Sequence, residues 1–199
     1  YNSMDGNLSY MNPFGTTTEE WRFKFDGDGV RVMEEYLLNG SSIHHRYFFA
    51  GGSYEVQVDA SETTTKEYYS IGGMMVALNT AVDDGQTETS TLTYMASDHL
   101  TSASIIMDDT GALLSEQRYM PFGEVRLDVG DTITETDLGY TGQRSYGDFG
   151  LMDYNARFYS PKLGRFVQPD TIVPELGNPF AWDRYAYNIN NPIRYIDPT

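Results

Sequence analysis

Residues 142–199 read GQRSYGDFGLMDYNARFYSPKLGRFVQPDTIVPELGNPFAWDRYAYNINNPIRYIDPT, and this stretch decides the fold of the chain. It contains six of the eight prolines in the sequence, which a long helix would not tolerate. It is also dense in Tyr and Phe, whose rings gain most when they are buried with any hydroxyl group at a polar edge. We therefore expect short strands and turns fixed by tertiary packing. One short helix is expected near 179–187, with Asn178 as its cap and Pro179 as its first residue.

The composition is that of a globular, strand-rich protein of one or two domains. Of 199 residues, 40% are hydrophobic and 14% are aromatic, which excludes a disordered chain. The 16 tyrosines favour strands over helices. The formal net charge of -16 argues against binding to nucleic acid or to an anionic membrane surface, because both need a basic face.

Several kinds of site are excluded by residues that the sequence lacks. There is no cysteine, so disulfides, thiolate metal sites and cysteine nucleophiles are excluded. No run of about 18 apolar residues occurs, so no membrane span is expected. The chain begins and ends within patterned sequence, and we expect it to be a piece of a larger polypeptide.

A unit of two strands around a glycine turn recurs along the first half of the chain. The three copies lie at 21–33, 45–58 and 66–78, with turns at 26–29, 50–52 and 72–73. The spacing of about 22 residues is typical of a repeat array. One hairpin cannot bury its own apolar face, so neighbouring hairpins must stack into a continuous sheet. We also expect a hairpin turn at 5–7 and a polar loop at 82–90.

Alternation of apolar and polar residues within these strands predicts which side chains face inward. If the register shifts by one residue, the alternate set is buried instead. The predicted inward set is Phe23, Phe25, Tyr47, Phe49, Tyr68, Ile105, Met107, Phe158, Phe166, Tyr185 and Tyr187.

The order of motifs resembles that of the RHS/YD-repeat proteins, and the C-terminal part resembles the RHS repeat-associated core domain. The segments YNSMDGN (1–7) and FDGDGVR (25–31) are similar to degenerate YD repeats. The resemblance covers essentially the whole chain, and so many motifs in the family's order make it specific. The core-domain motifs are DHL (98–100), DDTG (108–111), YMPFGE (119–124), YTGQ (140–143), GLMDY (150–154), ARFY (156–159), LGRF (163–166), PD (169–170), RYAY (184–187), NNP (190–192) and YIDP (195–198).

The resemblance implies an all-β fold. Stacked YD-repeat β-hairpins would form a curved or spiralling, shell-like sheet, closed by an irregular, aromatic-rich core plug with a short helix. We place degenerate YD-type hairpin repeats at 1–91 and the RHS repeat-associated core domain at 92–199. The two parts are expected to be continuous in one sheet.

The resemblance also implies a function. It indicates a structural scaffold that encloses or presents a variable C-terminal toxin domain, as in bacterial-type polymorphic toxins that are secreted or lie at the cell surface. The expected partners are the chain's own C-terminal effector domain, upstream RHS/YD repeats and other copies of the chain, but not nucleic acid. The alternative is an extracellular adhesion module without cargo, similar to the teneurins, that binds protein or carbohydrate.

In many members of this family the core domain is an aspartyl autoprotease, and this is the most enzymatic activity that we expect here. Cleavage would fall just after residue 199. Two carboxylates that share a proton can act as base and acid, and the candidates are Asp170 and Asp183. Arg165 would orient a carboxylate or the scissile carbonyl. The alternative is structural: Asp170 as a turn or cap residue, with Arg165 as its ion-pair partner.

No metal or cofactor is expected. The three histidines are scattered, and His44 and His45 fall on opposite faces of a strand, so they cannot jointly bind a metal without a bulge. His99 is expected to make a structural hydrogen bond at a strand end. The segment from Asp26 to Asp28 looks like the start of a calcium loop, but no Glu stands at its twelfth position, so we interpret it as a turn.

Overall fold

The computed structural model describes residues 9–12, 18–130, 133–170 and 182–195. The chain forms two compact units, which are described separately below. The first comprises the residues up to Met95 together with Asp108–Ala112, and the second comprises Ala96–Met107 together with the residues from Leu113 onward. The boundary at 91/92 between repeat types stays a prediction.

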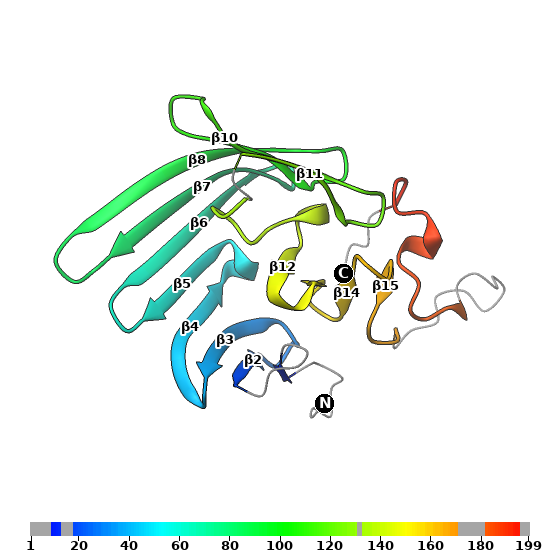
Figure 1. Ribbon diagram of the computed structural model, residues 1–199, viewed down its shortest axis with the longest axis horizontal. Helices are drawn as coiled ribbons and strands as arrows, with labels where there is room; N and C mark the ends of the chain where they lie inside the picture. The colour runs from blue at the N-terminus through cyan, green and yellow to red at the C-terminus, as the bar shows by residue number, and fades with distance from the viewer. Residues whose placement is uncertain (1–8, 13–17, 131–132, 171–181, 196–199) are drawn as a thin grey trace. The chain divides into compact units, whose positions relative to one another are not determined.

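The first unit is a layer of antiparallel strands that lie side by side in chain order and curve along their length (Figure 1). Each strand from β1 to β8 pairs with the next one along the chain. The strands are β1 (Tyr10–Met11), β2 (Glu19–Phe25), β3 (Arg31–Leu38), β4 (Ser41–Phe49), β5 (Tyr54–Asp59), β6 (Thr63–Ile71), β7 (Met74–Asp83) and β8 (Glu88–Ser97), with a 3-10 turn, η1 (Ala50–Gly52), between β4 and β5.

The three predicted hairpin repeats are confirmed as the pairs β2–β3, β4–β5 and β6–β7. The loop predicted at 82–90 is wrong over most of its length, because β7 and β8 extend to Asp83 and Glu88 and pair there. Cross-strand hydrogen bonds thus continue through residues whose polarity suggests a loop. The turn predicted at 5–7 lies outside the described residues.

Several turns share one local geometry that an aspartate sets. Asp26 Oδ1 accepts hydrogen bonds from the backbone N–H groups of Asp28 and Val30, both at 2.9 Å. This bears out the interpretation of the segment as a turn. The fourth residue, Gly29, has φ of 79°, a conformation that glycine adopts without a Cβ clash.

The same arrangement recurs twice further along the chain. Asp98 Oδ1 accepts from the N–H groups of Leu100 and Ser102, and Asp108 Oδ1 accepts from those of Thr110 and Ala112. At the end of β8, these hydrogen bonds are accepted by the side chain of Asp98, the residue before His99. The same aspartate turn therefore reverses the chain at three places, after Asp26, Asp98 and Asp108.

The predicted inward set is right in part and wrong in β4, in β9 and near 185. Phe48, not Phe49, is buried in β4, and Ile106 has no exposed surface while its two neighbours are only partly buried. Where two apolar residues are adjacent, apolar and polar residues do not alternate, so the sequence does not indicate which of the two is buried. Tyr185 is 40% exposed. The correctly predicted buried residues are Phe23, Tyr68, Phe158, Phe166 and Tyr187.

The second unit contains a meander and a small separate sheet. The meander is β9 (Ala103–Met107), β10 (Leu113–Tyr119) and β11 (Val125–Gly130), and β10 pairs with both of the others. The small sheet is β12 (Arg144–Tyr146), β13 (Leu151–Asp153), β14 (Phe158–Ser160) and β15 (Arg165–Phe166), in that order. Short 3-10 turns lie at η2 (Tyr140–Gly142), η3 (Gly147–Phe149) and η5 (Asn188–Asn190).

The irregular, aromatic-rich character predicted for 142–199 is confirmed over 142–170 and 182–195, and the predicted helix is only partly described, with Trp182 in a 3-10 turn. Its first residues, including Asn178 and Pro179, lie outside the described residues. Residues 183–187 form a turn closed by a hydrogen bond from Ala186 N to Asp183 O, followed by an isolated bridge. Within the described ranges, no helix is long and apolar enough to cross a membrane.

Gly123 is the turn glycine whose replacement the structure penalises most. It has φ of 88°, and an added Cβ would approach Tyr140 Cδ1 to 2.6 Å. Gly111 has φ of 85°, but nothing lies within 4 Å of an added Cβ. Backbone strain costs about 1 kcal/mol at both positions, and the clash adds about 1–3 kcal/mol at Gly123.

We predict that Gly123→Ala lowers the free energy of unfolding clearly more than Gly111→Ala does. Urea denaturation followed by circular dichroism measures both values. Equal losses in the two variants would contradict the close packing of the Gly123 turn against Tyr140.

Candidate functional site

The second unit is built on four buried tyrosines, Tyr140, Tyr154, Tyr159 and Tyr187, which we call the tyrosine cluster. At most 1% of each residue is exposed. The Tyr159 and Tyr187 ring centroids are 4.5 Å apart, and the Tyr154 ring meets its neighbours edge to face. Such tilted ring pairs are favoured over face-to-face stacking. Leu100, Met152 and Phe166 complete the core.

Each hydroxyl group of the tyrosine cluster has a hydrogen-bond partner. The Tyr154 hydroxyl lies 2.7 Å from Thr141 Oγ1 and donates to the Tyr187 hydroxyl at 3.0 Å. Tyr140 donates to the carbonyl of Pro121, and Tyr159 donates to that of Phe122. These bonds tie the Met120–Glu124 turn to the small sheet.

Burial raises the pKa of every tyrosine in the cluster above its ordinary value, because an ionised phenol would lose its hydration. Neighbouring phenolic groups raise the pKa of Tyr140, Tyr154 and Tyr159 further. The cluster is therefore neutral at physiological pH and serves as a rigid support for β14 and β15.

Phe166 connects this core to the candidate aspartates. Its ring packs edge to face on Tyr154 and Tyr159 and is buried. The Arg157 guanidinium lies over the same ring, 3.7 Å from its centroid. Arg157 Nη1 is 2.9 Å from Asp170 Oδ2, so the arginine is held between an aromatic face and a carboxylate.

Backbone hydrogen bonds bring the two predicted carboxylate-bearing segments side by side. Phe166 N donates to Tyr185 O at 2.9 Å, and Asp170 N donates to Arg184 O at 2.8 Å. Arg165 and Ala186 form an isolated antiparallel bridge. The segment that carries Asp170 thus runs along the segment that begins at Asp183.

The three predicted site residues fall into two ion pairs. Asp170 pairs with Arg157, and Arg165 Nη2 lies 3.8 Å from Asp183 Oδ2. The Arg157 side chain is 13% exposed, whereas that of Arg165 is 51% exposed. Arg157 is therefore the arginine that fixes a carboxylate firmly, whereas Arg165 is a looser surface partner of Asp183.

Sequence reasoning missed Arg157 as a site residue, although it lies within the ARFY motif. Its neighbour on the chain, Phe158, also helps to position the segment, because its N–H donates to Gln168 Oε1 at 2.6 Å. The sequence feature that could have identified Arg157 is its position between two strand-forming stretches, with Asp170 following the later strands.

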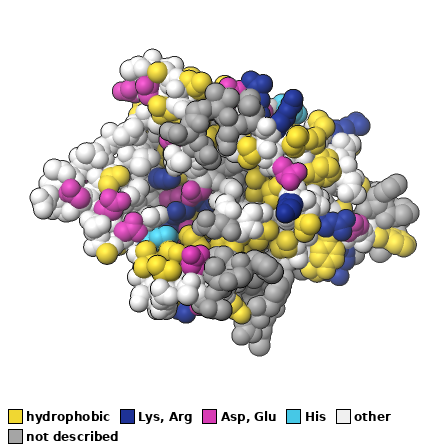
Figure 2. All heavy atoms as spheres, viewed as in Figure 1, with side chains coloured by type: hydrophobic (Ala, Val, Ile, Leu, Met, Phe, Trp, Pro, Cys, Tyr) yellow, Lys and Arg dark blue, Asp and Glu magenta, His cyan; other side chains and the backbone are white. Residues whose placement is uncertain are grey.

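Hydrophobic and basic side chains are interspersed on the side of the molecule where β14 and β15 lie (Figure 2).

The described residues contain no cluster of three or more His, Asp or Glu that could hold a metal ion. His44 and His45 pair with different carboxylates: His44 Nδ1 lies 3.8 Å from Asp59 and His45 Nε2 lies 3.3 Å from Glu35. What the second unit offers chemically is a pair of carboxylates, each beside an arginine, on adjacent segments.

Residues 86–193 match the sequence model of the family described as the Teneurin YD-shell. The tRNA nuclease WapA of Bacillus subtilis is 25% identical over 201 residues, covering 98% of this chain and 8% of that protein. Teneurin-3 of Mus musculus is 24% identical over 181 residues, covering 87% of this chain and 6% of that protein.

Solved structures show the same fold at lower sequence identity. The TcdB2-TccC3-TEV crystal structure superposes with a TM-score of 0.81 and 20% identity, covering 98% of this chain and 10% of that one. A Photorhabdus luminescens Tc holotoxin pore gives a TM-score of 0.80 at 19% identity and the same coverage. The chain therefore spans a tenth or less of the length of these relatives.

We predict different stability costs for the two arginines. Arg157→Met removes a mostly buried ion pair and leaves the Asp170 carboxylate without its 2.9 Å partner, so the free energy of unfolding should fall by about 1–3 kcal/mol. Arg165→Met removes an exposed pair and should cost less than about 0.5 kcal/mol.

Urea denaturation of both variants measures this difference. The two variants are matched, because each replaces one arginine with methionine. Arg165 lies in the small sheet and Arg157 lies directly before one of its strands. An equal or reversed order of stability would show that Arg157 does not anchor the Asp170 segment.

Proposed function

Because this chain belongs to the Teneurin YD-shell family, we propose that it is part of the wall of an RHS-type shell that encloses a variable C-terminal effector domain. The chain has the YD-shell fold, and in its first unit the strands pair without interruption in chain order from β1 to β8. This ladder is the observation that carries the proposal, because it can be extended by further hairpins before β1. We place the protein outside the cell or at its surface, as part of a longer polypeptide.

The names of the relatives support a toxic cargo. One relative is a tRNA nuclease, and this chain aligns with 8% of that protein. A nuclease that acts on tRNA would harm the cell that makes it unless it were kept apart from the cytoplasm. We therefore infer that the effector enclosed here is an enzyme of this destructive kind.

We further propose that the second unit cuts its own chain just after residue 199. In this hydrolysis, a carboxylate accepts a proton from water as the oxygen bonds to the scissile carbonyl carbon. A second carboxyl group then donates a proton to the leaving amine, and the peptide C–N bond breaks. Asp170 is assigned as the base because Arg157 orients its carboxylate, and Asp183 is assigned as the acid. Arg165 orients Asp183.

One experiment tests enclosure and cleavage together, with two separate readouts. The natural protein, with its upstream repeats and its C-terminal continuation, is run on a denaturing gel and, in parallel, treated with trypsin under native conditions. We expect two fragments on the gel, and we expect the released C-terminal fragment to elute with the shell and to resist trypsin until the shell is unfolded.

Variants separate the two claims. Asp170→Asn and Asp183→Asn should leave the chain at full length while the C-terminal domain still resists trypsin. Asp109→Asn, in an exposed turn, is the matched control and should cleave normally. Full-length wild-type protein, or cleavage in the Asp170 and Asp183 variants, contradicts the self-cleavage proposal. A C-terminal domain that trypsin digests at once contradicts enclosure, whatever the state of cleavage.

A further inference from the structure

One face of the strands β4 to β8 carries two rows of side chains that no function above uses. In an antiparallel sheet, residues that are directly opposite on neighbouring strands share a face, as do residues two apart along one strand. The register therefore places the following side chains on a single face: Phe49, Tyr54, Glu67, Asn79 and Leu92 in one row, and Tyr69, Ala77 and Tyr94 in the next.

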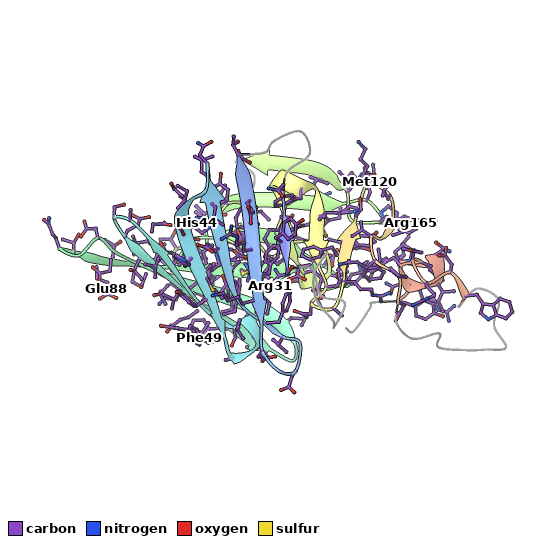
Figure 3. The ribbon with its side chains drawn as sticks, turned by 90° about the horizontal axis from the view of Figure 1, so that it is seen from below. Arg31, His44, Phe49, Glu88, Met120 and Arg165 are labelled. Atoms are coloured by element: carbon purple, nitrogen blue, oxygen red, sulfur yellow. The ribbon has the colours of Figure 1, made fainter. Side chains whose placement is uncertain are left out.

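The aromatic residues on this face are exposed. Phe49 is 51% exposed, Tyr69 48% and Tyr94 42%, whereas Tyr68 and Leu78, their neighbours on the opposite face, are buried. Phe49 projects away from the strands in the view with side chains (Figure 3). We call Phe49, Tyr54, Tyr69 and Tyr94, together with Glu67, the aromatic platform. Exposed rings gathered in this way differ from the single apolar residues found on most surfaces.

Polar contacts fix parts of the platform. The Tyr69 hydroxyl donates to Glu67 Oε2 at 2.9 Å, which holds the ring back along β6. The Phe49 and Tyr54 ring centroids are 5.9 Å apart. Ala77 lies in register between Tyr69 and Tyr94, and its small side chain leaves a low, apolar floor between the two rings.

The charge around the platform is mainly acidic. The strands β4 to β8 contain two Lys or Arg residues, Arg46 and Lys66, and the register puts both on the opposite face. Arg46 donates to Gln57 Oε1 there and lies 3.3 Å from Glu34. On this face of β5 to β8 the charged residues are Glu67, Asp83 and Glu88, and Glu88 lies at the tip of the β7–β8 hairpin (Figure 3). The basic residues Arg22 and Lys24 lie on the same face in β2, beyond β3 and β4.

We propose that the aromatic platform is a docking surface for a basic polypeptide segment. Arginine and lysine side chains lay their apolar stems or their cationic planes on aromatic rings and place their charge beside a carboxylate. Exposed rings around Glu67, with no Lys or Arg on this face of the strands β4 to β8, supply both partners. The charge of -16 on the whole chain draws such a segment toward the protein.

Carbohydrate is the other ligand that stacks on exposed aromatic rings. A neutral sugar gains only hydrogen bonds from its hydroxyl groups to a carboxylate, whereas a basic side chain gains Coulombic attraction as well. The mainly acidic charge around the platform therefore favours the peptide.

The test is fluorescence anisotropy with a labelled peptide of alternating Arg and Gly, added to the 199-residue chain. We expect saturable binding that salt weakens, a dissociation constant raised about three- to fivefold in both Tyr69→Ala and Tyr94→Ala, and a similar rise in Glu67→Gln. Tyr195→Ala, an exposed tyrosine of the second unit, and Asp109→Asn, an exposed acid elsewhere, are the matched controls and should bind as the wild type does.

Equal binding by the platform variants and the controls would show diffuse attraction to an acidic protein and would overturn the proposal. Absence of binding to the Arg–Gly peptide would overturn it as well. Binding of a neutral glucose hexasaccharide that displaces the peptide, or that occurs in its place, would assign the platform to carbohydrate instead. Circular dichroism of each variant verifies that the exposed substitutions leave the fold intact.

Discussion

Buried tyrosine hydroxyl groups must be hydrogen-bonded, and this constraint holds the second unit together. The strands of the small sheet in this unit are only two or three residues long. Its order therefore depends on four rings whose hydroxyls reach one another, Thr141, or the backbone of the Met120–Glu124 turn. Phe166 packs on these rings, Arg157 lies on Phe166, and Asp170 pairs with Arg157. Any chemistry at Asp170 is in this way supported by the tyrosine cluster.

The first unit is stabilised differently. Its strands from β2 to β8 have six to ten residues, each pairs with the next along the chain, and the chain reverses at aspartate or glycine turns. Each hairpin in a sheet of this kind contacts only its neighbours, so further hairpins can be added at the edge without changing the existing residues. The two faces of this sheet differ in burial. One face carries buried side chains such as Phe23 and Leu78, and the other carries the exposed aromatic platform.

The sequence was sufficient to predict the hairpins, because Gly and Asp at the turns act locally. It could not decide the face wherever two apolar residues are adjacent, as at Phe48 and Phe49, since alternation then carries no information. The candidate carboxylates could be named from their motif, but the role of Arg157 could not. Its contact with Asp170 joins residues thirteen positions apart, and only the packing on Phe166 selects Arg157 over Arg165.

The central claim is that the tyrosine cluster is a closed, neutral core, and an alkaline titration tests it most directly. The pKa of each cluster tyrosine is higher in the folded chain than the unfolded value of about 10. The folded state thus binds more protons above that pH, so stability is fully present below about pH 10 and falls as the pH rises further. Tyrosinate absorbance and circular dichroism are followed together. The account predicts that the four tyrosines of the cluster ionise only as the fold is lost. Ionisation of all 16 tyrosines in one step near pH 10, with the fold retained, would contradict it.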